Sequence, residues 1–170
     1  MDSHVRYVLV LEVERQAKFG LMAVSDLNAA LASQDTDRVW YSIQSLLIAA
    51  GNVSKLLWPA KAYAERGQTL RQALSISDES VLAPRTFRNH FEHFDERLET
   101  WSVADPPRNF VDSNIGPPGM ISGLDPASFL RNLDTKDWAV TFRGDAYQLR
   151  PIAAALQGLH ARAAQLKDAR

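Results

Sequence analysis

The sequence predicts a mainly α fold, an up-and-down bundle of four or five helices with a small β-hairpin insert near the C-terminus. Three observations lead to this prediction. Apolar residues recur at steps of three and four over the N-terminal half. A segment rich in proline and glycine then interrupts the helical pattern at 105–126. A short stretch after it alternates apolar and polar residues with a period of two, as a half-buried strand does.

The composition bounds the kinds of protein this chain can be. Its 170 residues match the usual length of one domain, so 1–170 is predicted to be a single helical domain. The net charge is −1 and the pI is about 6.4, without the basic excess that binding along a nucleic-acid backbone favours. The absence of cysteine excludes disulfides, thiolate metal sites and cysteine nucleophiles. It also fits a reducing compartment, so a cytoplasmic location is expected.

No membrane association is expected from the apolar segments. The run from Val8 to Leu11 is too short for the core of a signal peptide. The richest apolar stretch, Ile43 to Trp58, is interrupted by polar residues and falls short of the roughly 20 residues that span a bilayer.

The first two helices are predicted from their apolar stripes. One helix of about seven turns is expected to end at Gln34–Thr36, and a second to end at Pro59, because proline cannot continue the hydrogen-bond ladder. The first stripe consists of Val5, Leu9, Val13, Ala17, Gly20, Val24, Leu27 and Leu31. The second consists of Val39, Ile43, Leu46, Ala50, Val53 and Leu57. A shorter third helix is predicted over about 60–74, with Gly67 weakening it.

A fourth helix is predicted from Pro84 to about Val103. Proline suits the first turn of a helix, where its missing N–H would be unpaired in any case. The core stripe of this helix is predicted to be Phe87, Phe91, Phe94, Leu98 and Trp101. On a continuous helical wheel, Arg88, Asn89 and His93 point away from that stripe, and His90 lies at its edge.

The remaining elements follow in order. The Pro/Gly-rich segment 105–126 is predicted to be a long loop. The region 129–149 is predicted to hold the β-hairpin, with Trp138, Val140 and Phe142 on one strand and a turn at Gly144-Asp145. A final helix begins at Pro151, with Ile152, Leu156, Leu159 and Ala163 on one face.

An arginine, an asparagine and a histidine on the outer face of one helix permit two interpretations. They can form a solvated surface, with Arg88 and Glu92 paired at i, i+4. They can also form a phosphodiester-cleaving or nucleotide-binding patch, because histidine moves protons near neutral pH and arginine stabilises charge on phosphoryl oxygens.

The pattern Arg88-Asn89-x-x-x-His93 resembles the signature of the HEPN superfamily. Members of that superfamily are all-helical domains, and many are RNases of toxin–antitoxin and defence systems. The resemblance implies that Arg88, Asn89 and His93 are catalytic and that a homodimer builds a composite site. It also implies an RNA substrate, an antitoxin partner and no cofactor. Arg85, on the same face, and His90 are the expected substrate-binding residues.

Under this hypothesis, His93 acts as general base or acid, Arg88 stabilises the phosphorane and Asn89 orients the histidine or the phosphate. Catalysis needs no metal and yields a 2′,3′-cyclic phosphate. Glu92, Glu96 and Glu99 border the same face and repel phosphates. A non-catalytic HEPN-like binding or scaffold protein, and an unrelated bundle with a coincidental motif, therefore remain as alternatives.

A metal site is not predicted. His90 and His93 have acidic neighbours, but they differ by about 60° on the helical wheel. No Glu-x-x-His pair recurs on a second helix, as the di-iron bundles require.

Overall fold

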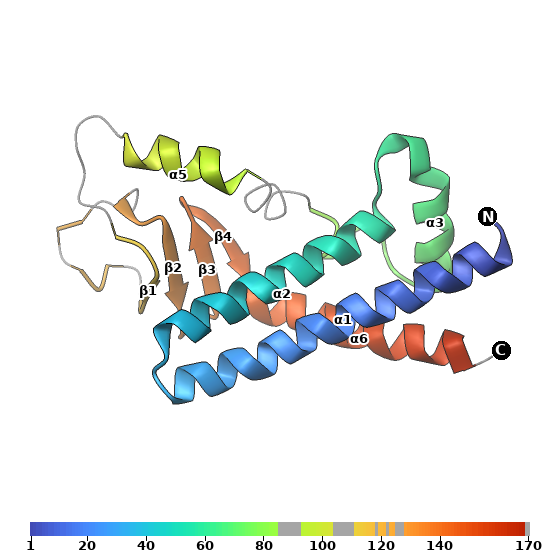
Figure 1. The fold of residues 1–170 in the computed structure, drawn as a ribbon, viewed down its shortest axis with the longest axis horizontal. Coiled ribbons are helices and arrows are strands. Elements are labelled where there is room, and N and C mark those ends of the chain that lie inside the picture. The colour runs from blue at the N-terminus through green and yellow to red at the C-terminus, as the bar shows by residue number, and fades with distance from the viewer. Residues whose placement is uncertain (85–92, 104–110, 118, 122, 125–127, 169–170) are drawn as a thin grey trace. The chain divides into compact units, whose positions relative to one another are not determined.

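A computed structural model of the chain describes residues 1–84, 93–103, 111–117, 119–121, 123–124 and 128–168. The fold is mainly helical with a small four-stranded sheet near the C-terminus, which confirms the predicted fold class at that level (Figure 1). The chain divides into two compact units. Unit 1 comprises 1–85 and 151–170, and unit 2 comprises 86–150.

Unit 1 is built on two long helices, α1 (Ser3–Ala32) and α2 (Thr36–Leu57), which lie side by side (Figure 1). Each begins at an aspartate whose carboxylate accepts backbone N–H groups of the first turn. Asp2 accepts from His4 and Val5, and Asp35 accepts from Arg38 at 3.0 Å. These caps fix where the two helices begin. The short connection between α1 and α2 reverses the chain direction.

The core stripes of the two helices match the sequence to different degrees. All six predicted residues of α2 are buried. In α1, Val13, Ala17, Gly20 and Leu27 are buried as predicted, but Val5 is exposed and Leu9, Val24 and Leu31 are only half-buried. Val10, Ala23 and Ala30 are buried instead. The buried face therefore shifts gradually around α1 along its length. This happens because the period of a straight helix, about 3.6 residues per turn, differs from the average spacing of its apolar residues.

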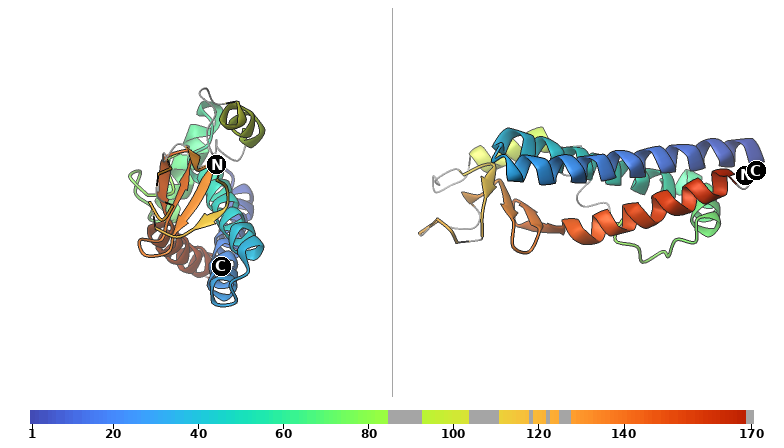
Figure 2. Two further views of the ribbon diagram at one scale, coloured as in Figure 1. Left: turned by 90° about the vertical axis from the view of Figure 1, so that its left-hand side faces the viewer. Right: turned by 90° about the horizontal axis from the view of Figure 1, so that it is seen from below.

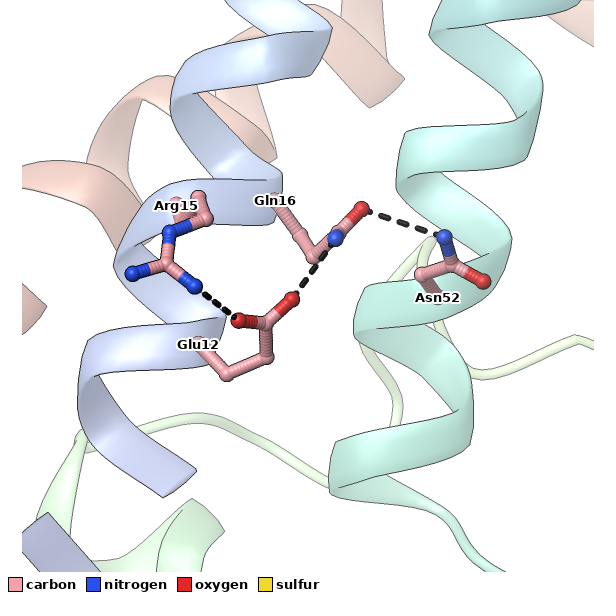
Figure 3. A network of polar contacts seen from close by, with 4 residues as sticks. All are labelled: Glu12, Arg15, Gln16 and Asn52. Atoms are coloured by element: carbon pink, nitrogen blue, oxygen red, sulfur yellow. Dashed lines mark hydrogen bonds and ion pairs between the residues drawn. The ribbon is translucent and has the colours of Figure 1, made fainter. Parts of the chain in front are cut away.

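A polar contact joins α1 and α2 within unit 1. Asn52 Nδ2 donates to Gln16 Oε1 at 3.1 Å, and Gln16 Nε2 donates to Glu12 at 2.7 Å (Figure 3). Glu12 also pairs with Arg15 at 2.9 Å. The contact fixes the register of the antiparallel helices, since residue 16 of α1 lies level with residue 52 of α2.

The last helix, α6 (Leu149–Asp168), runs along α1 (Figure 2). Its four predicted core residues are all buried. The two helices approach closely at Gly20 of α1, where an added Cβ would lie 2.6 Å from Leu156 Cδ1. Lys167 Nζ also donates to Glu14 of α1 at 2.9 Å. Unit 1 therefore completes its core with the segment that follows unit 2.

The predicted third helix is divided in two. A single 3₁₀ turn, η1 (Lys61–Tyr63), precedes α3 (Ala64–Ala73). Gly67 does not break α3, and the helix passes so close to Pro59 that a Cβ there would lie 2.4 Å from the proline Cδ. Arg71 Nη1 donates to the Leu57 carbonyl, which satisfies an oxygen left free at the end of α2.

Unit 2 contains the helix α5 (Phe94–Ser102) and a sheet of strand order β1-β2-β3-β4. The strands are β1 (Asn114–Ile115), β2 (Arg131–Asp134), β3 (Ala139–Phe142) and β4 (Asp145–Gln148). Strands β2, β3 and β4 pair antiparallel, while β1 pairs parallel with β2. The sheet is therefore wider than the predicted hairpin, and β1 falls inside the predicted loop.

The turn between β3 and β4 lies one residue before the predicted position. Arg143 and Gly144 both have positive φ angles, 50° and 89°, whereas the prediction placed the turn at Gly144-Asp145. Two central residues with positive φ are the requirement of the tight hairpin turn that matches strand twist. Val140 and Phe142 face the buried side, in agreement with the alternation, but Trp138 precedes β3 with a φ of 53° and is not part of the strand, contrary to the prediction.

Candidate functional site

The predicted site lies in the segment that leads into α5. Of its residues, only His93 belongs to the part of the chain that the structure describes. Arg85, Arg88, Asn89 and His90 lie outside the described residues. The spatial relation of His93 to the motif arginine therefore stays a prediction.

The prediction of one unbroken helix from Pro84 to Val103 is wrong. His93 is the N-cap of α5, with φ −124° and ψ 36°, and the helix begins at Phe94. Asp95 and Glu96 occupy the first turn, where the positive end of the helix dipole favours negative side chains. The wheel that placed Arg88, Asn89 and His93 on one face assumed a continuous helix through His93, so that placement no longer has support.

The core stripe predicted for this helix is also wrong where it can be compared. Phe94 is 54% exposed and Leu98 is 40% exposed, while Trp101 is half-buried. Phe87 and Phe91 lie outside the described residues. The apolar period identifies which residues share a face of the helix, but it carries no information about what covers that face.

His93 has a carboxylate partner that the sequence interpretation treated only as a repulsive charge. Its Nδ1 lies 3.2 Å from Glu96 Oε1, and both side chains are exposed. A carboxylate can only accept, so the shared proton belongs on Nδ1 when the imidazole is neutral. The other ring nitrogen, Nε2, is then left to take a proton from a substrate. The i, i+3 spacing of the two residues was the signal in the sequence that could have identified this pair.

Helix α5 contacts the β3–β4 hairpin within unit 2 through Arg97. Arg143, in the hairpin turn, donates to the carbonyl of Arg97 at 3.4 Å. Tyr147 of β4 lies within electrostatic reach of Arg97, and burial, reinforced by the charge of Asp145, raises the pKa of Tyr147 above its usual value. The phenol therefore stays neutral near pH 7 and does not act there as a base. The Arg143 hydrogen bond joins α5 to the hairpin, while the side chains of His93 and Glu96 stay exposed.

A second polar cluster connects the loop before β1 to β2. Arg131 makes a two-point ion pair with Asp112, at 2.7 Å for the Nε contact. Asn114 donates its side-chain amide to Asn132, which is buried. Asp134, also buried, accepts the N–H groups of Lys136 and Asp137 and so closes the turn to β3. The polar atoms of this cluster bond to one another, which marks it as structural.

The described residues contain no group of three or more histidine, aspartate and glutamate side chains that could hold a metal ion. Within the same residues, no helix combines the length and apolar character that crossing a membrane requires. Comparison of the chain with protein-family models, with curated proteins and with solved structures found no match.

Proposed function

We propose that this chain is a metal-independent RNase of HEPN type, built as a four- or five-helix bundle with a hairpin insert, in the toxin role of a toxin–antitoxin or defence system. It acts in the cytoplasm as a homodimer whose motif segments form one composite Arg/His site. The sequence Arg88-Asn89-x-x-x-His93 motivates the proposal. The observation that carries it is the exposed His93 imidazole with Glu96 on Nδ1.

The chemistry requires no cofactor. His93 Nε2 takes the proton of a ribose 2′-OH, whose oxygen attacks the adjacent phosphorus. Arg88 stabilises the charge on the phosphorane, and Asn89 orients the phosphate. The bond from phosphorus to the 5′-oxygen then breaks, this oxygen takes the proton from the protonated His93, and the product carries a 2′,3′-cyclic phosphate. Glu96 stabilises the imidazolium that forms midway, much as a buried aspartate does in a catalytic triad.

A direct test is expression in a bacterial host of the wild-type chain beside Arg88→Ala and His93→Ala variants, followed by inspection of total RNA. The proposal expects growth arrest and new RNA fragments from the wild type alone, with cyclic phosphate at their 3′ ends. His4→Ala is the matched control, because His4 is also exposed but lies on α1. Fragments that persist in the His93→Ala variant would show that another group cleaves.

A non-catalytic HEPN-like binding protein is the second candidate, and one observation favours it. The face of α5 that holds Phe94 and Leu98 is exposed, and Asp95, Glu96 and Glu99 make the helix acidic. Such a surface repels phosphates and suits a protein partner with an apolar centre and basic edges. Harmless expression of all variants, together with loss of a purified complex on Leu98→Glu, would select this second function.

A further inference from the structure

An exposed tyrosine and an arginine form a pair at the start of α3 in unit 1. Tyr63 ends η1 and is the N-cap of α3, and Arg66 follows it by three residues. Arg66 Cζ lies 4.9 Å from the centroid of the Tyr63 ring, as in a cation–π contact. Tyr63 is nevertheless 58% exposed, and its chain neighbours Ala62 and Ala64 are small and exposed. The guanidinium therefore covers part of the ring, and the rest of the ring is open to a flat ligand.

The positive charges around this ring have no carboxylate partner in the described part of the chain. Neither Lys61, which is exposed, nor Arg66 forms an ion pair there. The Nε of Arg66 is buried and has no hydrogen-bond partner within the described residues. Glu65 is the only acidic residue of 59–77. It differs from Arg66 by about 100° around the helix, so the two side chains leave α3 in different directions. The charges of Lys61 and Arg66 are therefore available to an anionic ligand.

A second arginine–aromatic pair in unit 1 has a purely structural explanation. Arg71 Cζ lies 5.6 Å from the ring centroid of Trp58, but Arg71 Nε also pairs with Asp78 at 2.5 Å. Its Nη1 donates to a main-chain carbonyl of α2, and its side chain is only 15% exposed. Contacts within the chain therefore satisfy the cation of Arg71. The more exposed Tyr63–Arg66 pair lacks such a carboxylate, so packing of the chain does not account for it.

We propose that Lys61, Tyr63 and Arg66, which we call the Tyr63 surface, bind single-stranded RNA. An unpaired base stacks on the open part of the Tyr63 ring, and the phosphates beside that base contact Lys61 and Arg66. This choice of ligand rests on the proposed RNase, whose substrate it narrows to RNA with unpaired bases. The Tyr63 surface supplies positive charge locally, whereas the whole chain carries a net charge of −1.

The combination of groups on the Tyr63 surface selects this class of ligand. Every base has a π face, so stacking on an aromatic side chain holds unpaired bases of any sequence. The bases of a duplex are already stacked and paired, and an acidic peptide offers negative charge without a flat ring. A nucleotide chain with unpaired bases provides the ring and the phosphate together. A duplex of the same sequence and a polyglutamate peptide are therefore expected to bind at least about tenfold more weakly.

The first experiment measures binding of a fluorescent RNA of about 12 nucleotides by anisotropy, with the full chain at about 1 to 300 µM. The 2′-hydroxyls of this RNA are methylated, so attack by the 2′-oxygen is impossible. Tyr63→Ala is expected to raise Kd by about tenfold or more, because a stacked base is lost. Tyr41→Ala is the matched control and is expected to leave Kd unchanged, since Tyr41 is an exposed tyrosine of α2 in the same unit. No binding by the wild type, equal effects of the two variants, or equal affinity for the duplex would each refute the proposal.

The salt dependence of binding separates the phosphate contacts from the stacking. Each phosphate of a single strand that a cation neutralises contributes about −0.7 to the slope of log K against log salt concentration. Lys61→Ala is expected to reduce the magnitude of that slope by about 0.7, whereas Tyr63→Ala is expected to weaken binding without changing the slope. Lys18→Ala, at an exposed lysine of α1, is the matched control. If Lys61→Ala and Lys18→Ala give the same slope as the wild type, Lys61 does not contact a phosphate and the proposed surface is wrong.

Photocross-linking locates the bound base on the protein. The methylated RNA is prepared with 4-thiouridine in place of uridine and irradiated in complex with the wild type. Trypsin cleaves after Lys61 and Arg66, so Tyr63 lies in the short peptide 62–66, which holds no other aromatic residue. Mass spectrometry is expected to find the RNA adduct on this peptide. Adducts on other peptides, with none on 62–66, would contradict the proposal.

The outcome is distinguishable from that of the proposed RNase. If the methylated RNA binds through the Tyr63 surface but the wild type cleaves no ordinary RNA, the surface is established and the RNase proposal fails. If Tyr63→Ala cleaves ordinary RNA with the KM and kcat of the wild type, the RNase stands and the Tyr63 surface is refuted. Circular dichroism of each variant separates loss of binding from loss of the fold.

Discussion

Two glycines in helices of unit 1 show how one Cβ atom changes stability in either direction. At Gly67, a Cβ would lie 2.4 Å from Pro59 Cδ and 2.7 Å from the Leu57 carbonyl oxygen, and neither can move independently of the backbone. At Gly158 of α6, the nearest atom would be the flexible tip of Arg162, at 3.4 Å. The space around the residue, rather than its helical position, therefore decides the effect.

The expected result is that Gly67→Ala lowers the free energy of unfolding by about 2 kcal/mol or more through overpacking. Gly158→Ala is expected to raise it by about 0.5 to 1 kcal/mol, because alanine restricts the unfolded chain and favours the helix. Urea denaturation of both variants measures the two values. Similar changes of the same sign would mean that the close approach of α3 to Pro59 is not a rigid contact.

A variant at Glu96 tests whether this carboxylate positions His93 in the proposed RNase or only adds a negative charge that repels phosphate. If Glu96 holds His93 in the tautomer with a free Nε2, Glu96→Gln should lower the rate of RNA cleavage by about tenfold or more and shift its pH profile. Glu99→Gln removes an equal charge one turn later on α5, where it has no contact with His93 in the described structure. Removing phosphate repulsion alone would instead accelerate both variants.

At the scale of elements, the Asp112–Arg131 pair ties the segment before β1 to β2. Burial by itself would raise the pKa of Asp112, but the hydrogen bond and charge of Arg131 and the N–H of Ser113 outweigh it, so the pKa lies below its usual value. A carboxyl group with a lowered pKa stabilises the fold above about pH 4 and loses that contribution as the pH falls through its folded value.

Asp112→Asn is therefore expected to destabilise the protein at pH 7 by about 1 kcal/mol or less, because the pair is one-third exposed and screened by solvent. The difference from the wild type should shrink as the pH falls below 4. Urea denaturation at pH 7 and pH 3 measures both. A difference that is equal at the two values would show that the pair contributes packing rather than charge.

The elements also show which parts of the fold the sequence could predict. The apolar stripes of α2 and α6 were predicted correctly. Both helices are buried along most of their length, and such helices show a regular apolar period in their sequence. Strand β2 was missed as a distinct strand, since three of its four residues are polar, among them the buried Asn132 and Asp134. Asn132 is buried with Asn114, a partner 18 residues away that no local pattern reports. Asp134 instead accepts the N–H groups two and three residues after it, which is a local turn contact.

The candidate site was predictable only in part, for a related reason. The motif spacing proposed His93 as a site residue, and the i, i+3 spacing could have predicted its contact with Glu96. The acidic residues of the first turn favour a helix that starts at Phe94. The apolar period in the sequence favours a helix that continues through this position. The sequence interpretation gave weight to the period alone and therefore continued the helix through His93.

At the scale of the whole molecule, unit 1 is discontinuous in sequence. Its core needs α6, which follows the 65 residues 86–150 that form unit 2. Replacing 86–150 with a flexible linker of about a dozen glycine and serine residues is expected to leave α1, α2, α3 and α6 folded, because their buried contacts lie within unit 1.

Deleting 151–170 instead removes Ile152, Leu156 and Leu159 and exposes the faces of α1 and α2 that they cover. That variant is expected to lose cooperative unfolding and most of its protection from proteases. Circular dichroism and limited proteolysis compare the two. If the truncated chain unfolds as sharply as the full one, α6 is an accessory to the core and not part of it.

The discontinuity of unit 1 has a consequence for synthesis. At a translation rate of about 5 to 20 residues per second, α6 leaves the ribosome many seconds after α2. During that interval α1 and α2 carry an uncovered apolar surface, while the continuous unit 2 can already fold. A nascent chain is therefore most exposed to chaperones and aggregation between these two moments. A messenger RNA truncated within the codons for α6 yields a chain without this helix. Cellular proteases can recognise such a chain by the uncovered apolar surface of α1 and α2.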